Sequence, residues 1–298
     1  MSVHEPVLTT EVVTWLAPFG GGLFVDCTVG LGGHTRALLD AGAARVIALD
    51  RDAAALALAA DTLAAYRDRV ELVHADYRTL AEVLQARGID RIDGALADLG
   101  VSSLQLDSID RGFSFKRDEP LDMRMDRSQG ATASDLLATA PEADLADVIF
   151  RFGEERYSRR IARAIVDARR TAPITSTAKL AQIVRRAVPT RGYQRIDPAT
   201  RTFQALRIWV NRELEGLDAF LRVTVERLRE GARLVVISFH SLEDRIAKHT
   251  FRALERAEAL VRVLTKHPVV PTDEEIARNP RARSAKLRAV MRVGVQTA

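Results

Sequence analysis

The sequence predicts an α/β fold in which a mostly parallel sheet is interrupted by a helical insertion. Short apolar runs alternate with helix-forming stretches up to about residue 103, no convincing strand follows before residue 204, and a further buried strand comes later. Strands that alternate with helices need crossover connections, so they form parallel sheets covered on both faces. We therefore expect a first part at 1–103, an inserted helical domain at 104–204 and a second part of the sheet domain at 205–298.

Four apolar runs in the first part are typical of buried parallel strands. These are Gly22–Asp26, Arg45–Asp50, Val70–His74 and Ile92–Leu99. The stretches between them have strong helix propensity, most clearly the alanine-rich one. They are His34–Ala41, Ala53–Tyr66 and Leu80–Arg87. Each of the first three strands is thus followed by a helix, as a parallel sheet requires.

The insertion and the chain after it show a different pattern. Three helices are expected in the insertion, at Ala143–Phe152, Ser158–Arg169 and Thr177–Ala187. Helical sequence then continues through Ala205–Arg229, and Arg233–Ser238 supplies one more buried strand that completes the sheet. The tail, Leu260–Val295, contains short β-branched runs that predict a final hairpin.

Composition places the chain among soluble globular proteins. The hydrophobic share is 47%, the charged share 28% and the net charge +4. No signal-peptide pattern or membrane-spanning run is present, and the one cysteine, Cys27, excludes an intramolecular disulfide. We therefore expect a cytoplasmic protein. Arginines gather in two segments that suit a polyanionic partner or a solvated surface equally. They are Arg156, Arg159, Arg160, Arg163, Arg169 and Arg170 in the first, and Arg278, Arg281, Arg283 and Arg288, with Lys286, in the second.

A ligand site is expected at the carboxyl ends of the strands, where parallel sheets bind ligands. Gly30, Gly32 and Gly33 follow the first strand, and Asp50 ends the second, where an acid can bind both ribose hydroxyls of an adenosine. The third glycine comes too early for a dinucleotide fingerprint. A ligand without phosphates, such as S-adenosylmethionine, fits this loop better than a nicotinamide dinucleotide does.

Two more residues complete the expected site. Asp98 ends the fourth strand, where it could hold the N–H groups of a poorly nucleophilic aromatic amine or bind the cofactor instead. Tyr77, just beyond the third strand, could stack on an adenine ring or be an ordinary core residue.

Long motifs throughout the chain resemble the bacterial small-subunit ribosomal RNA cytosine-N4 methyltransferase H family, also called MraW. The resemblance rests on HEPVL, VDCTVGLGGHT, ALDRD, DLGVSSLQLD, RGFSF, LDMRMD, GEERYSRRIARAI, ATRTFQALRIWVNRELE, ISFHSLEDR and NPRARSAKLR, in this order from His4 to Arg288. It departs from the family at Leu104, where proline is expected, and at Tyr77, which is often phenylalanine.

The resemblance implies a Rossmann-like methyltransferase domain with a helical insertion, S-adenosylmethionine as donor, and a cytidine in the decoding region of 16S ribosomal RNA as acceptor. Carried over by motif, the cofactor residues are Gly32, Gly33, His34, Asp50, Tyr77, Asp98 and Gln105. Asp98 is the expected catalytic residue. Arg281, Arg283 and Arg288, together with the basic insertion, are the expected phosphate contacts.

Other interpretations are weighed against this one. His240, Ser241 and Asp244 lack the flanking glycines of a hydrolase nucleophile turn, so we expect them to shape a pocket wall or to cap a helix that begins near Leu242. The dispersed histidines predict no metal site. A nicotinamide-dependent oxidoreductase and a non-catalytic assembly factor on the same fold are the rival functions. The sequence leaves both a monomer and a homodimer open.

Overall fold

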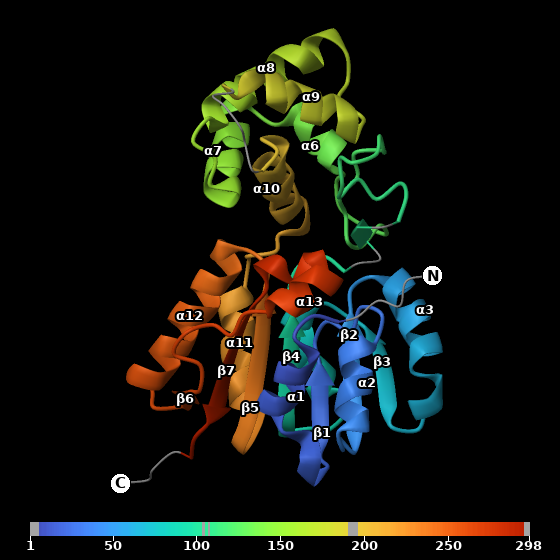
Figure 1. The fold of residues 1–298 in the computed structure, drawn as a ribbon, viewed down its shortest axis with the longest axis vertical. Helices are drawn as coiled ribbons and strands as arrows, with labels where there is room; N and C mark the ends of the chain where they lie inside the picture. The colour runs from blue at the N-terminus through green and yellow to red at the C-terminus, as the bar shows by residue number, and fades with distance from the viewer. Residues whose placement is uncertain (1–5, 103–104, 107, 190–195, 295–298) are drawn as a thin grey trace. The chain divides into compact units, whose positions relative to one another are not determined.

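The computed structural model describes residues 6–102, 105–106, 108–189 and 196–294. The chain forms two compact units (Figure 1). Unit 1 contains residues 1–100 and 214–298, and unit 2 contains residues 101–213. Among the described residues, no helix is both long enough and apolar enough to cross a membrane.

Unit 1 is built on a seven-stranded sheet in the order β3-β2-β1-β4-β5-β7-β6. Its strands are β1 (Leu23–Asp26), β2 (Arg45–Asp50), β3 (Val70–His74), β4 (Ile92–Asp98), β5 (Leu228–Ser238), β6 (Val261–Val263) and β7 (Lys286–Arg292). The first five strands pair in parallel, and β7 pairs antiparallel with both β5 and β6. The α/β prediction is confirmed, and this order is that of a Rossmann-like sheet with an added antiparallel strand.

Helices cover both faces of this sheet, because adjacent strand residues point to opposite sides. Phe24 packs in the cluster that contains residues of α1, α2 and α3, whereas the next residue, Val25, packs with α4, α11 and α12. The helices are α1 (Thr9–Leu16), α2 (Gly33–Asp40), α3 (Ala53–Thr62), α4 (Leu80–Gln85), α11 (Leu217–Arg227), α12 (Ser241–Arg256) and α13 (Asp273–Arg278).

Unit 2 is helical and has a core of its own. Its helices are α6 (Ala133–Thr139), α7 (Glu142–Gly153), α8 (Ser158–Thr171), α9 (Thr177–Ala187) and α10 (Ala199–Asn211). Their apolar faces meet in one buried cluster that also includes Leu121 and Met123. Side-chain caps fix two of the helix starts: Thr132 accepts the Asp135 N–H and Ser176 accepts the Lys179 N–H.

The second boundary of the insertion differs from the expected one. A boundary after residue 204 falls inside α10, which packs against α7 and belongs wholly to unit 2. The helical sequence expected over Ala205–Arg229 forms the end of α10 and all of α11, because Arg212 and Gly216 adopt left-handed conformations (φ 51° and 68°) that separate the two helices. The chain therefore returns to unit 1 through this break.

The tail and the N-terminal segment add features that the pattern did not predict. β6 and β7 pair antiparallel, but a long connection that contains α13 joins them, so they are not a tight hairpin. At the other end of the chain, α1 buries Val12 and Leu16 against the sheet face that carries α2 and α3.

Candidate active site

The loop from β1 to α2 needs glycine for two different reasons. Gly30 and Gly32 have left-handed backbones (φ 52° and 84°), which side chains disfavour. Gly33 is limited by space, because a Cβ there would lie 2.7 Å from Cγ of Pro6. The glycines therefore allow the loop to turn at the strand end and to pack closely beneath the N-terminal segment.

Asp50 ties this loop to the end of β2. Its Oδ2 accepts the Gly30 N–H at 2.9 Å, and its Oδ1 accepts the Asp52 N–H at 2.9 Å. Burial raises the pKa of Asp50 to about 6, despite these two hydrogen bonds. Each carboxylate oxygen can accept two hydrogen bonds, so both keep acceptor capacity for a ligand hydroxyl.

Asp98 and His34 lie together at the end of β4. Nε2 of His34 is 3.5 Å from Oδ2 of Asp98, and the His34 side chain is only 6% exposed. The Asp98 backbone N–H donates to Oγ1 of Thr28 at 2.7 Å, which fixes the strand end against the glycine loop. Oδ1 of Asp98 has no hydrogen-bond partner among the described residues. This buried oxygen therefore has acceptor capacity that the described residues do not use.

Opposing effects act on the imidazole of His34. Burial by itself lowers its pKa, but the carboxylates of Asp98, Asp26 and Glu275 more than reverse this, so the pKa lies above the ordinary value of 6.5. Within the described residues, neither ring nitrogen makes a hydrogen bond. His34 thus brings positive charge to a group of acids.

Asp26 is a site residue that the sequence reasoning missed. It ends β1, is fully buried, and accepts the Thr35 hydroxyl at 2.7 Å and the Thr28 N–H at 3.1 Å. Burial raises its pKa, with opposition from His34 and these hydrogen bonds. The available signal was that three neighbouring strands, β1, β2 and β4, all end in aspartate. The edge of the sheet therefore concentrates carboxylates.

Tyr77 begins a short 3-10 turn just after β3. Its ring contacts Phe220 of α11, with centroids 4.6 Å apart and planes at 53°. Asp76, the residue before it, binds Arg78 through both carboxylate oxygens at 2.6 to 2.8 Å. The aromatic ring is therefore held at the same edge of the sheet as the ends of β2 and β3.

Gln105 belongs to unit 2, whereas the glycine loop belongs to unit 1. It is buried, and its Oε1 accepts the Ser102 N–H at 3.1 Å. The neighbouring Leu104, where the motif departs from the family, lies outside the described residues, as does His4.

The three arginines expected to contact phosphate differ in their surroundings. Arg281 and Arg283 are exposed on the 3-10 turn Pro280–Ser284. Arg288 is buried on β7, and its Nε donates to Oδ1 of Asp244 at 2.6 Å. We therefore withdraw Arg288 as a phosphate contact, because its guanidinium is engaged in an internal ion pair.

His240 caps a helix, which confirms one of the two expected roles. α12 begins at Ser241, Nδ1 of His240 accepts the Glu243 N–H at 3.4 Å, and Glu243 reaches back to the His240 N–H in a capping box.

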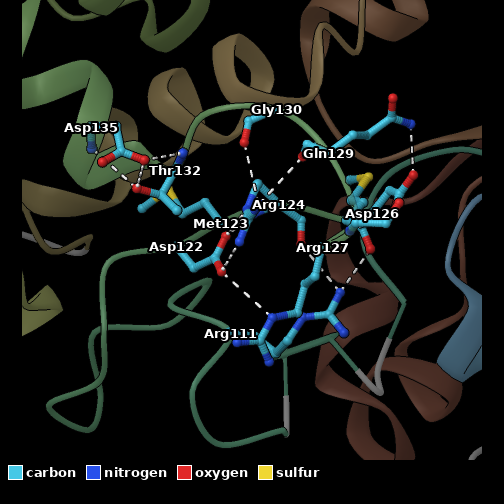
Figure 2. Close-up of polar contacts among 12 residues, drawn as sticks. Arg111, Asp122, Met123, Arg124, Asp126, Arg127, Gln129, Gly130, Thr132 and Asp135 are labelled. Carbon is cyan, nitrogen blue, oxygen red and sulfur yellow. Dashed lines mark hydrogen bonds and ion pairs between the residues drawn. The ribbon is translucent and has the colours of Figure 1, made fainter.

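The LDMRMD motif, Leu121–Asp126, forms a network of polar contacts within unit 2 (Figure 2). Nε and Nη2 of Arg124 donate to the two oxygens of Asp122 at 2.7 and 3.0 Å. Met123 is fully buried in a left-handed conformation (φ 63°), and Asn211 bonds the Met123 carbonyl and the Met125 N–H at 2.7 Å each. These contacts hold a strained loop in place.

The chain is similar to known proteins over almost its whole length. The chain is 49% identical to the ribosomal RNA small subunit methyltransferase H of Geotalea uraniireducens, over 97% of this chain and 98% of that protein. It is 47% identical to the protein of the same name from Anaplasma marginale, over 98% and 99%. Among solved structures, an rRNA methylase from Streptococcus thermophilus aligns with a TM-score of 0.45 and 12% identity, over 98% of this chain and all of that one. Because the model of the MraW methylase family matches residues 1–293, the chain belongs to that family.

Proposed function

We propose that this protein transfers a methyl group from S-adenosylmethionine to the N4 amino group of a cytidine in the decoding region of 16S ribosomal RNA. The observation that carries the proposal is the near-full-length match to relatives named ribosomal RNA small subunit methyltransferase H. The reaction would take place in the cytoplasm, where small subunits are made. The side chains at the carboxyl ends of the strands are of the types that this reaction would need, and they lie where a ligand of a parallel sheet would bind.

The acids at the strand ends suit a cationic nucleoside. Asp26 and Asp50 both have raised pKa values because burial disfavours their charged forms. A ligand that carries a sulfonium and an ammonium group would offset this accumulated negative charge. Asp50 would accept the ribose hydroxyls through the capacity its oxygens retain, and the turn at Gly30 to Gly33 would pass close to the amino-acid part.

Three further residues complete the proposed cofactor site. The ring of Tyr77 offers an aromatic surface for adenine, supported by its contact with Phe220. His34 and Gln105 are the other proposed contacts, as the family motif implies.

Asp98 is the proposed catalytic residue. When bound, S-adenosylmethionine supplies a methyl group that its sulfonium already activates, so the protein has to position the acceptor. The lone pair of the cytosine amino nitrogen is delocalised into the ring. The carboxylate of Asp98, whose buried Oδ1 has no hydrogen-bond partner among the described residues, would accept one N–H of this group and orient the nitrogen for transfer. The amino group must lose a proton when it is methylated, and Asp98 would receive that proton.

His34 is proposed to position Asp98. Its imidazole lies 3.5 Å from Oδ2 of that carboxylate. The raised pKa of His34 favours the imidazolium, whose charge would hold the carboxylate in place. The Thr28 hydroxyl fixes the backbone of Asp98 from the other side of the residue.

RNA contacts are proposed on both units. Arg281 and Arg283 are exposed and suit phosphate contact, whereas Arg288 stabilises β7 through Asp244. Unit 2 is proposed to recognise the substrate. The cytosine would have to leave its stack to reach Asp98, as for other enzymes that modify a base.

The proposal is tested by mass spectrometry of nucleosides from 16S ribosomal RNA of cells with and without this gene. We expect loss of N4-methylation at one cytidine in the deletion strain and its return with the wild-type gene. Asp98→Asn should not restore it, whereas Asp93→Asn should, because Asp93 lies at the opposite end of the same strand. An unchanged modification profile in the deletion strain would refute the proposed acceptor.

Two binding experiments separate the rival functions. Purified protein should bind S-adenosylmethionine in a calorimetric titration and should leave the fluorescence of reduced nicotinamide dinucleotide unchanged. A non-catalytic assembly factor would keep its cellular role in the Asp98→Asn variant. That alternative would be favoured if this variant fully restored growth and subunit assembly, and if neither the wild-type strain nor the variant strain showed methylation.

A further inference from the structure

The solvent side of α8 carries a run of arginines at helical spacing. Arg159, Arg160, Arg163 and Arg170 are exposed along it, and Arg156 is exposed immediately before its first turn. The opposite side of the helix, with Ile161 and Ile165, is buried in the core of unit 2. These arginines therefore face solvent because the apolar side of α8 is buried in the core.

Some of these arginines have a carboxylate partner within the fold and others do not. Arg170 lies 3.1 Å from Asp167 and Arg163 lies 3.7 Å from Glu142, so both have a carboxylate partner. Arg169, which sequence counting placed with them, donates to the carbonyl groups of Leu137 and Ala140 and supports α6.

Three arginines have no such partner. Among the residues that the structure describes, no carboxylate lies within 4 Å of Arg156, Arg159 or Arg160. We call these three residues the α8 arginine surface. Elsewhere in unit 2, Arg124, Arg185 and Arg207 are paired with acids. Other exposed cations of unit 2, such as Arg117 and Arg186, also lack a carboxylate partner among the described residues, but the α8 arginine surface gathers three such arginines within five residues.

This arrangement is unfavourable for the helix itself. Arg159 and Arg160 stand in the first turn of α8, which contains no acidic residue. The helix macrodipole is positive at this end, so cations here destabilise the helix. Charges that cost stability and have no partner within the fold indicate that the partner is external.

We propose that the α8 arginine surface binds the phosphate backbone of the substrate RNA. This rests on the proposed function and names the part of unit 2 that meets the substrate. Guanidinium groups suit phosphate, and one of them lies beside an aromatic ring: the Arg156 guanidinium is 4.7 Å from the centre of the Tyr157 ring. Rings beside arginines are typical of surfaces that contact nucleic acid.

A membrane surface fits the observations less well. An interfacial helix must insert its apolar side between lipids, whereas the apolar side of α8 is buried in the core of unit 2. Phosphate on a nucleic acid needs only the exposed side.

The test compares two triple variants that lose the same charge. Arg156→Gln/Arg159→Gln/Arg160→Gln removes the α8 arginine surface. The control Arg151→Gln/Arg163→Gln/Arg170→Gln removes three arginines of the same helix pair that have carboxylate partners. Binding to small ribosomal subunits from the deletion strain is measured between 50 and 200 mM salt.

Each phosphate contact contributes about 0.7 to 0.9 to the slope of log affinity against log salt concentration. The surface variant should therefore lower this slope by roughly two to three, and the control should change it by less than one. Equal changes in the two variants, or none in either, would overturn the proposal. So would stronger loss of binding to phosphatidylglycerol vesicles than to subunits.

Two readouts keep this test separate from the proposed function. Calorimetric affinity for S-adenosylmethionine should be the same in both variants and in the wild type. If wild-type protein transferred no methyl group to subunits, the proposed function would fail, but the salt slopes would still decide whether the surface binds RNA.

Discussion

Asp50 should make the stability of unit 1 depend on pH in a way that its asparagine variant does not. Burial raises its pKa from 3.8 to about 6. Because the folded-state pKa lies above the unfolded-state value, the folded protein binds this proton more tightly, and stability rises as the pH falls from about 7 toward 4. The full effect of two pKa units is about 3 kcal/mol.

Between pH 7.5 and pH 5, a range that the protein should tolerate, the expected change in the free energy of unfolding is smaller. At pH 5 the carboxyl group is about one unit below its folded-state pKa, so wild type should gain about 1 kcal/mol relative to pH 7.5. Asp50→Asn cannot titrate and lacks this gain. The free energy of unfolding of the variant minus that of the wild type should therefore be about 1 kcal/mol larger at pH 7.5 than at pH 5.

The two tryptophans allow this to be measured in unit 1 alone. Trp15 lies in unit 1 and Trp209 in unit 2, so fluorescence in a Trp209→Phe background reports unit 1 during urea unfolding. Asp61→Asn, on the exposed side of α3, is the control and should give a difference that does not vary with pH. A pH-independent difference for Asp50→Asn as well would refute the assignment of the raised pKa to this carboxyl group. The same variant should bind S-adenosylmethionine at least tenfold more weakly, because an amide offers fewer acceptors to the ribose.

Three other perturbations have defined outcomes. His34→Gln should lose stability relative to wild type below neutral pH, and the difference should shrink as the pH rises through the raised pKa of His34; a constant difference in urea unfolding would contradict this. Gly33→Ala should cost about 1 to 3 kcal/mol by overpacking against Pro6, and a double-mutant cycle with Pro6→Ala should recover part of the loss, whereas strict additivity would exclude the contact. Asn211→Ala orphans a buried N–H and a buried carbonyl, so unit 2 should lose about 2 to 5 kcal/mol in a Trp15→Phe background; a loss under about 1 kcal/mol would show that these groups find other partners.

The sheet could be predicted closely from the sequence because its central strands are buried on both faces. A doubly buried strand must be apolar along its whole length, so its ends are marked where polar residues return. The expected strand Arg45–Asp50 has the same bounds in the structure. The bounds of Val70–His74 were also predicted, although β3 lies at the edge of the sheet and is only partly buried. The acids at the ends of β2 and β4 were visible for the same reason, which is why Asp50 and Asp98 could be proposed at all.

What the sequence could not supply depends on contacts between distant residues. Arg288 looked like its exposed neighbours, but it lies on a strand that brings it to Asp244, 44 residues earlier. The break between α10 and α11 was hidden because Arg212 is not a residue that typically takes a left-handed conformation. The pairing of the α8 arginines was equally hidden, because Arg163 meets Glu142 only once α7 and α8 have packed together.

The electrostatics of the sheet edge link the fold to the proposed chemistry. Parallel strands place their carboxyl ends together, so the aspartates that end β1, β2 and β4 lie at one edge of the sheet, where burial and, to a lesser extent, neighbouring carboxylates raise the pKa values of Asp26 and Asp50. An isolated fold would gain stability by replacing them with neutral residues. They are useful only if positive charge arrives, partly from His34 within the fold and partly from a cationic ligand. The same reasoning applies to the α8 arginine surface with the opposite sign. Both places hold charge that destabilises the free protein, and each therefore indicates a charged partner that the folded chain alone does not provide.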